Sequence, residues 1–275
     1  MSILGLCPVA ALIACNLMSS LCTTSSKNTT ERFSIFSPEQ NCVCPSIVKN
    51  EQKELNITPV HKLDIPVETA TFGMGCFWGA ESLYGGTKGI VRTTVGYSGG
   101  TLNAPKYRSL GDHTEVLQID FDPKVITFKQ LLHLFWNNHE YGLCTPIKRQ
   151  YMSLILYHNE EQKEIAEASK IAEQKIRSHE KIYTEISPAN EFWPAEDYHQ
   201  KYRLQGHKDL CQSLGLTTSE LLQTSFVGTK LNGFIAGAGG VKGFLEEADK
   251  LGLTPSQIEY IRHYVEENEG RGLYC

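Results

Sequence analysis

A cysteine in a glycine-rich turn is the residue of this chain whose surroundings most favour chemistry. Residues 71–79 read TFGMGCFWG, with a β-prone run before the glycines and an amphipathic segment after Cys76. This order predicts a strand, a tight turn and a helix that begins beside the thiol. The unpaired N–H groups and the dipole of a helix start favour the thiolate, which is the nucleophilic form of cysteine. The alternative is an ordinary buried cysteine.

Two aromatic residues follow this cysteine directly. Phe77 and Trp78 would build an apolar wall suited to a sulfur-bearing group. In this strand and helix context, GCFWG resembles the active-site signature of the methionine sulfoxide reductase A family, and further matches extend the resemblance over roughly residues 67–202. The resemblance implies a thiol-dependent reductase that acts on the S epimer of methionine sulfoxide, in proteins and as the free amino acid. It implies no metal, flavin or nucleotide cofactor.

A glutamate in the stretch GDHTEVLQID is the second candidate residue. Strand alternation places Glu115 on one face with Leu117 and Ile119. A solvated edge glutamate is the alternative, but the resemblance implies an acid here that protonates the sulfoxide oxygen. A carboxyl group among apolar side chains has a raised pKa, as a general acid requires.

The thiol and this carboxyl group are expected to be coupled. Lowering a thiol pKa from about 8.5 to about 7 takes roughly 2 kcal/mol, whereas a helix terminus supplies about 0.3 to 1. An ionised Glu115 would also repel the thiolate of Cys76. We therefore hypothesise that the two side chains share one proton, so that their titrations belong to the pair.

Four further residues complete the predicted site. Tyr107 and Tyr151 match tyrosines that the family uses to hold the sulfoxide oxygen, although lone tyrosines are more often structural. His199 and Tyr202, in AEDYHQKY, resemble another family signature near the substrate. A predicted helix over 197–204 would place these two on one face, three residues apart.

The loop over 137–150 departs from the family pattern. Many relatives carry a GND-containing stretch before the glutamine and tyrosine, whereas this chain reads NNHEYGLCTPIKRQ and lacks the aspartate. Glu140 is a conceivable substitute. The departure leaves the core chemistry in place and leaves the substrate preference open.

Turnover requires a second thiol. Attack of a thiolate on a sulfoxide leaves a sulfenic acid, which condenses with another cysteine to a disulfide. The candidates are Cys144 in the divergent loop, Cys211 in the helical run KDLCQSL, and Cys275. We expect Cys211 to be a core residue and favour Cys275, because Gly270 and Gly272 make its segment pliable. The resemblance implies that a thioredoxin-like dithiol reopens the disulfide.

Two other functions remain open at this stage. A binding module could cage a thioether with its aromatic residues and perform no turnover. A cysteine hydrolase could use Cys76 with His113 or His199 as the base, although such an enzyme needs an orienting partner for the histidine, and the sequence offers no signature of one.

The elements that must position these residues follow an alternating pattern from residue 67 onward. Their order, β-α-β-β-α-β at first, predicts an α+β fold with a two-layer, ferredoxin-like core, a mixed or antiparallel sheet and flanking helices. We assign the catalytic domain to 67–204 and a helical C-terminal extension with a pliable tail to 205–275, with a glycine-rich break at 233–243. Strands are expected at 67–73, 90–97, 114–121, 151–157 and 182–187, and helices at 76–85, 127–138, 159–178, 197–204 and 254–267.

Composition bounds the partners. The 275 residues carry a formal charge of −5 and no basic cluster, which argues against nucleic acid. Cys42 and Cys44 form a pair without a second pair at metal spacing, so no metal site is predicted. We expect a monomer.

The N-terminal region has its own character. Residues 3–22 form an uncharged, largely apolar run, so segment 1–22 is signal-peptide-like and favours the secretory pathway. The missing basic residues before the run keep a membrane anchor and a cytoplasmic extension as alternatives. Residues 23–66 read as a linker or a poorly ordered extension.

Overall fold

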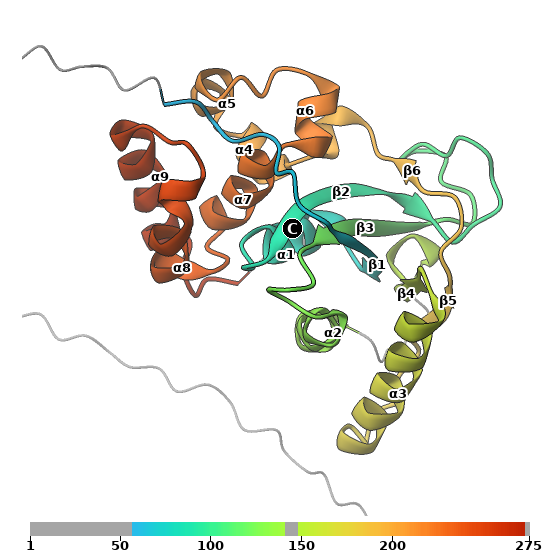
Figure 1. Ribbon diagram of the computed structural model, residues 1–275. Helices are drawn as coiled ribbons and strands as arrows, with labels where there is room; N and C mark the ends of the chain where they lie inside the picture. Colours follow the sequence, from blue (N-terminus) through green and yellow to red (C-terminus); the bar gives the residue numbers. More distant parts are fainter. Residues whose placement is uncertain (1–56, 141–147, 273–275) are drawn as a thin grey trace, which may run out of the picture. The chain divides into compact units, whose positions relative to one another are not determined.

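The computed structural model describes residues 57–140 and 148–272, which belong to one compact unit. The core sheet has the strand order β5-β4-β1-β3-β2-β6, in which β4 and β5 are parallel and the other pairs are antiparallel. The first six strands and α-helices follow one another as β-α-β-β-α-β, and the α+β prediction is confirmed (Figure 1). The elements up to β6 are β1 (Glu68–Met74), α1 (Phe77–Gly85), β2 (Ile90–Ser98), β3 (Thr114–Phe121), α2 (Phe128–Asn137), β4 (Ser153–Tyr157), α3 (Glu160–Ile176), β5 (Glu185–Pro188) and β6 (Trp193–Pro194).

The main core lies between one face of the sheet and helices α1 and α2. The ring of Phe72 on β1 packs against Tyr84 of α1 and against Phe128 and Phe135 of α2, with centroid separations of 5.3 to 5.9 Å. Leu117 pairs with Phe72 across the sheet, so the alternating residues of β3 face this core. The helix that begins at the cysteine is therefore held on a rigid apolar layer.

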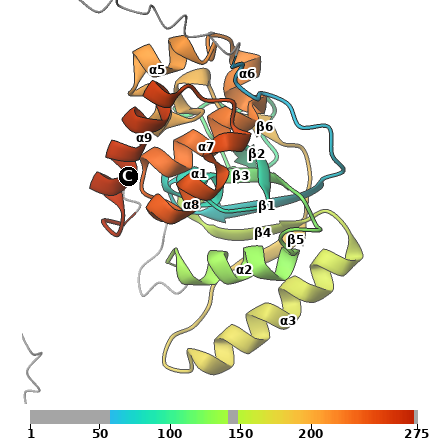
Figure 2. The same cartoon turned by 60° about the vertical axis from the view of Figure 1, so that its left-hand side comes forward.

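A helical region follows β6 and covers the β2 side of the sheet, while α2 and α3 lie on the β4 side (Figures 1 and 2). Its helix α7 crosses α1 closely, because a Cβ at Gly233 would lie 1.9 Å from the backbone N of Gly86. Only glycine permits this approach. The helices of this region are α4 (Tyr202–Gln205), α5 (Lys208–Ser213), α6 (Ser219–Thr224), α7 (Phe226–Ile235), α8 (Gly240–Glu247) and α9 (Pro255–Asn268).

The segment 57–66 packs on this helical region. The N–H of Val60 donates to the carbonyl of Leu251 over 3.0 Å, and its carbonyl accepts from the N–H of Val227 over 3.0 Å. The last residues of the expected linker thus pack against the helices. The division between a catalytic domain at 67–204 and an extension at 205–275 stays a prediction.

Three predicted elements differ from the structure. The helix expected over 197–204 is interrupted, since a 3-10 turn over Asp197–His199 is followed by Lys201 with φ of 51° before α4 begins. Tyr151 does not open a strand but ends the 3-10 turn Arg149–Tyr151, and β4 begins at Ser153. The glycine-rich break spans only 236–239, because α7 continues to Ile235 and α8 begins at Gly240.

Several expectations fall outside the described residues: the signal-peptide-like segment, most of the linker, Cys144 and Cys275. In 57–140 and 148–272, no helix combines the length and the apolar character needed to cross a lipid bilayer.

Candidate active site

The cysteine turn has the predicted geometry. Gly75 has a φ of 79°, a left-handed conformation that favours glycine, and it turns the chain from β1 into α1. Cys76 is the N-cap residue of α1, with extended φ and ψ of −64° and 121°, and it is partly exposed. The thiol therefore stands at the positive end of a helix dipole, where a thiolate is stabilised.

The predicted acid lies at the same helix end. Glu115 is 1% exposed on β3, and its Oε2 accepts from the backbone N–H of Phe77 over 3.2 Å. Its Oε1 accepts from Nε2 of Gln150 over 2.7 Å. Burial raises the pKa of Glu115, while these two hydrogen bonds lower it by a smaller amount. The expected burial among apolar neighbours is thus present, and its effect on the carboxyl group is in the direction that a general acid requires.

The two predicted tyrosines lie together beside this carboxyl group. Burial, a hydrogen bond with Tyr107 and the nearby charges of Glu115 and Cys76 raise the pKa of Tyr151. The backbone N–H of Tyr107 is anchored by Oε1 of Glu196 over 3.1 Å. The phenol of Tyr151 therefore remains a protonated donor near the thiol.

The indole of Trp78 is held from two sides. Its Nε1 donates to Nδ1 of His199 over 3.1 Å, and its ring stacks on Tyr202 with centroids 3.7 Å apart and planes 3° apart. His199 also contacts the rings of Phe77 and Tyr107, at 5.1 and 4.6 Å. The prediction that His199 and Tyr202 share one helix face is wrong, because the backbone turns at Lys201 between them. They nevertheless meet at the same indole.

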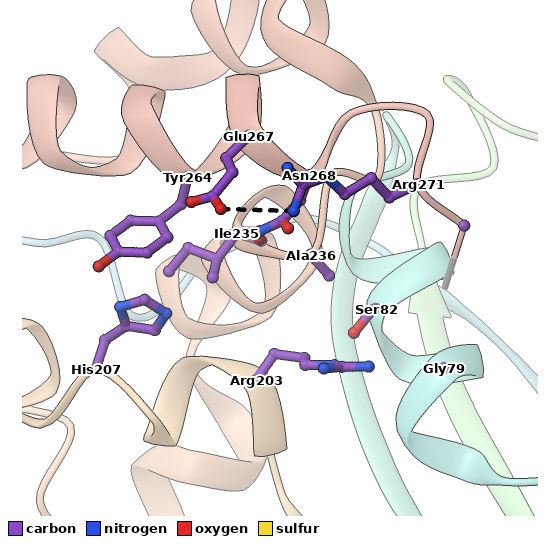
Figure 3. Close-up of a pocket in the computed structure, with 11 residues that line it drawn as sticks. Gly79, Ser82, Arg203, His207, Ile235, Ala236, Tyr264, Glu267, Asn268 and Arg271 are labelled. Carbon is purple, nitrogen blue, oxygen red and sulfur yellow. Dashed lines mark hydrogen bonds and ion pairs between the residues drawn. The ribbon is translucent and has the colours of Figure 1, made fainter. Parts of the chain in front are cut away.

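Two cavities adjoin the cysteine helix. One of about 250 Å³ is lined by Cys76, Gly79, Ala80, Leu83, Met74, Asn138 and Gly272. A larger one of about 490 Å³ shares Gly79 and Gly272 with it and lies between α1 and the helical region, bordered by Arg203, His207 and Tyr264 (Figure 3). Because the two cavities share wall residues, the cavity that Cys76 lines adjoins the one at the helical region.

One of the two alternative bases, His113, and the buried cysteine Cys211 lie outside the site. Nδ1 of His113 accepts from the N–H of Gly100, and its Nε2 donates to the carbonyl of Leu102. Both nitrogens of His113 are therefore used by the backbone of a turn, which disfavours a hydrolase that uses this base. Cys211 is buried in the core of the helical region, where burial raises its thiol pKa, as expected of a core residue.

Sequence reasoning missed Gln150 and Glu196 as members of the site. Gln150 directly precedes Tyr151 in a 3-10 turn, and no periodicity marks the side of such a turn. Glu196 lies in the quoted signature, where its Oε2 also accepts from the hydroxyl of Tyr97 over 2.7 Å. Glu140, the conceivable substitute for the missing aspartate, is exposed. Within the described ranges, no cluster of three His, Cys, Asp or Glu side chains could hold a metal ion.

Two family models match this chain. Residues 68–228 match the model described as peptide methionine sulfoxide reductase. Residues 215–266 match the helical domain of selenoprotein methionine sulfoxide reductase A. The second match covers much of the helical region that borders the larger cavity.

Individual proteins match as well. The chain is similar to a peptide methionine sulfoxide reductase of Drosophila melanogaster, with 66% identity over 230 residues, which cover 84% of this chain and 93% of that protein. Among solved structures, Mxr1 from Saccharomyces cerevisiae in reduced form has 29% identity and a TM-score of 0.48, covering 54% of this chain and 91% of that chain. The same yeast protein in complex with Trx2 has 30% identity and a TM-score of 0.35, covering 48% and 84%.

Proposed function

This chain belongs to the peptide methionine sulfoxide reductase family, and we propose that its Cys76 and Glu115 carry out the reduction of methionine (S)-sulfoxide. The observation that carries this assignment is the burial of Glu115 at the N-terminus of the helix that Cys76 begins. The thiol and a carboxyl group whose pKa is raised by burial are thereby held at one helix end.

The reaction follows from this pairing. The thiolate of Cys76 attacks the sulfoxide sulfur while the protonated Glu115 donates its proton to the sulfoxide oxygen. The oxygen is transferred to the cysteine sulfur, methionine leaves, and Cys76 becomes a sulfenic acid. The sulfoxide is reduced by two electrons and the thiol is oxidised by two.

The aromatic residues bind the substrate. Phe77 and Trp78 supply the apolar wall for the methyl and methylene groups, with His199 and Tyr202 supporting the indole. The hydroxyl groups of Tyr107 and Tyr151 donate hydrogen bonds to the sulfoxide oxygen, where charge accumulates as the sulfur is attacked.

Cys275 is the resolving cysteine in this proposal. It lies outside the described residues, but Gly272, three positions earlier, borders the cavity that contains Cys76. Three extended residues span at most about 10 Å, a distance on the scale of that cavity. The Cys275 thiol attacks the sulfenic acid, a disulfide forms and water leaves. Mass spectrometry after oxidation by substrate alone tests this role, because a disulfide that joins Cys76 to another cysteine would exclude it.

A thioredoxin-like dithiol then reopens the disulfide. Its thiolate attacks one sulfur, and its second thiol resolves the mixed disulfide, so that two electrons and two protons return to the enzyme. Protein-bound and free methionine sulfoxide are both substrates in this proposal. A turnover assay with thioredoxin in place of dithiothreitol tests the partner.

One incubation separates the proposed chemistry from the two other functions. The wild-type protein with an S-sulfoxide substrate and dithiothreitol should release methionine, and Cys76→Ser should release none. A thioether-binding module would bind the substrate without turnover in either form. A cysteine hydrolase would cleave an ester or amide and leave the sulfoxide oxidised.

A further inference from the structure

The structure places a fully buried ion pair behind the aromatic wall. Nζ of Lys201 lies 2.8 Å from Oε1 of Glu81, and both side chains have an exposed fraction of 0%. We propose that this pair is a positioning device that fixes Trp78 between His199 and Tyr202 and thereby sets the affinity for the sulfoxide substrate. The affinity part rests on the proposed function, whereas the placement of the indole does not.

The pair joins four separate parts of the fold. Glu81 lies on α1, one turn after Trp78, and its Oε1 also accepts from the hydroxyl of Thr93 on β2 over 3.2 Å. Its Oε2 accepts from Nδ2 of Asn232 on α7 over 3.5 Å. Nζ of Lys201 donates to the carbonyl of Thr93 over 2.6 Å. The loop after His199 is therefore fastened to the cysteine helix, to the sheet and to the helical region at one point.

Lys201 contributes its backbone as well as its ammonium group. Its N–H donates to Oε2 of Glu81 over 2.8 Å, so one residue binds both carboxylate oxygens of its partner. Lys201 makes these two hydrogen bonds with a left-handed φ of 51°, which a lysine adopts rarely and only where its surroundings impose it.

The left-handed turn decides how the neighbouring residues meet the indole. In a continuous helix, His199 and Tyr202 would lie on one face. With the turn between them, His199 approaches the indole nitrogen at 3.1 Å while Tyr202 stacks on the ring at 3.7 Å. The two hydrogen bonds from Lys201 to Glu81 therefore hold the turn that brings His199 and Tyr202 to two sides of Trp78.

Stability alone does not account for this arrangement. Replacing a buried ion pair with neutral side chains of similar volume is often neutral or stabilising, so such a pair is weak evidence for a stabilising role. Its charge-assisted hydrogen bonds do fix direction, because a carboxylate held by four donors has little freedom. A fixed position of Trp78 is required if the indole is to hold the substrate in one orientation.

A second buried pair provides a matched control. Nζ of Lys230 lies 2.7 Å from Oε2 of Glu247, with exposed fractions of 0% and 13%, and donates to the carbonyl of Thr87 over 2.8 Å. Thr87 follows the end of α1 opposite to Cys76. This pair has similar burial and binds the residue that follows the C-terminus of α1, at the end away from the aromatic wall.

The test compares two double variants in the full chain. Glu81→Gln/Lys201→Met and Lys230→Met/Glu247→Gln each replace a buried pair with neutral side chains of similar size. Turnover of N-acetyl-methionine (S)-sulfoxide with dithiothreitol gives kcat and KM. Nitrogen-15 NMR of the tryptophan indoles reports Trp78 without any activity, and Trp78→Phe identifies its signal among the three tryptophans.

We expect the Glu81/Lys201 variant to raise KM about tenfold or more with a smaller change in kcat, and to shift the Trp78 indole signal. The Lys230/Glu247 variant should leave KM and kcat within about twofold of wild type and the Trp78 indole signal in place. Equal effects of the two variants, or an unmoved Trp78 signal, would overturn the proposal. If the Glu81/Lys201 variant moves the Trp78 signal but the wild-type protein has no reductase activity, only the proposed function is overturned. Should the Glu81/Lys201 variant lose its cooperative unfolding, Lys201→Arg keeps the charge but displaces the backbone, and an unchanged KM and signal there would overturn the proposal too.

Discussion

Gln150 donates a hydrogen bond from Nε2 to Oε1 of Glu115 over 2.7 Å, inside a site where burial raises the pKa of that carboxyl group. The backbone N–H of Phe77 donates to Oε2 over 3.2 Å. These two donors favour the carboxylate, whereas burial favours the neutral acid and has the larger effect. The proton affinity of Glu115 is therefore set by a balance that single substitutions can shift.

Removing Gln150 should shift this balance toward the neutral acid. In Gln150→Met, the pKa of Glu115 should rise further, so the alkaline limb of the pH profile of kcat/KM should move to higher pH. The profile is measured from pH 5 to about 10 with saturating dithiothreitol. Gln118→Met, on the opposite face of β3, is the control and should leave the limb in place. An alkaline limb that stays at the same pH in Gln150→Met would show that Glu115 does not determine it.

The carboxyl group itself should be needed for the chemical step. Glu115→Gln keeps the size of the side chain but replaces one accepting oxygen with an NH2 donor and carries no transferable acid proton, so kcat should fall by about 10²- to 10⁴-fold. KM should change little, because the aromatic wall is intact. The hypothesis of a shared proton predicts that the pH dependence of the residual rate also changes. A variant with the wild-type rate and profile would defeat both the acid role and the coupling.

His139 should make stability sensitive to acid. Burial lowers its pKa to about 4, from the ordinary value of 6.5, in a site where it bonds to Phe135 and Ser153. The folded protein thus binds fewer protons than the unfolded chain between these values, so the free energy of unfolding should decrease as the pH falls from 6.5 to about 4. The loss is on the order of 3 kcal/mol, since one pKa unit corresponds to about 1.4 kcal/mol.

Thermal unfolding across this pH range measures the effect. His139→Gln should flatten the decrease, because no imidazole remains to be protonated. His133→Gln, in the helix α2 that ends two residues before His139, is the matched control, since His133 is exposed, and it should retain the wild-type slope. Identical slopes in wild type and His139→Gln would show that other groups titrate there.

Much of the fold was predictable from local patterns. The alternation around Glu115 placed it on the apolar face of β3, and the glycines before Cys76 predicted the turn into α1. The break at Lys201 was not predictable, because it depends on Glu81, 120 positions away in the sequence. The hydrogen bond from Gln150 to Glu115 likewise depends on a long-range approach of a 3-10 turn to a strand. Periodicity predicts which face a residue occupies in a helix or strand, but Lys201 and Gln150 both lie in turns, where it predicts nothing.

The most direct test of the central claim is a single turnover in the absence of any reductant. The Cys275→Ser variant is mixed with excess methionine (S)-sulfoxide and a sulfenic-acid trap, and the released methionine and the modified peptides are quantified. The account predicts about one methionine per protein molecule and the trap on Cys76. Methionine release by Cys76→Ser under the same conditions, or a trap found only on another cysteine, would contradict it.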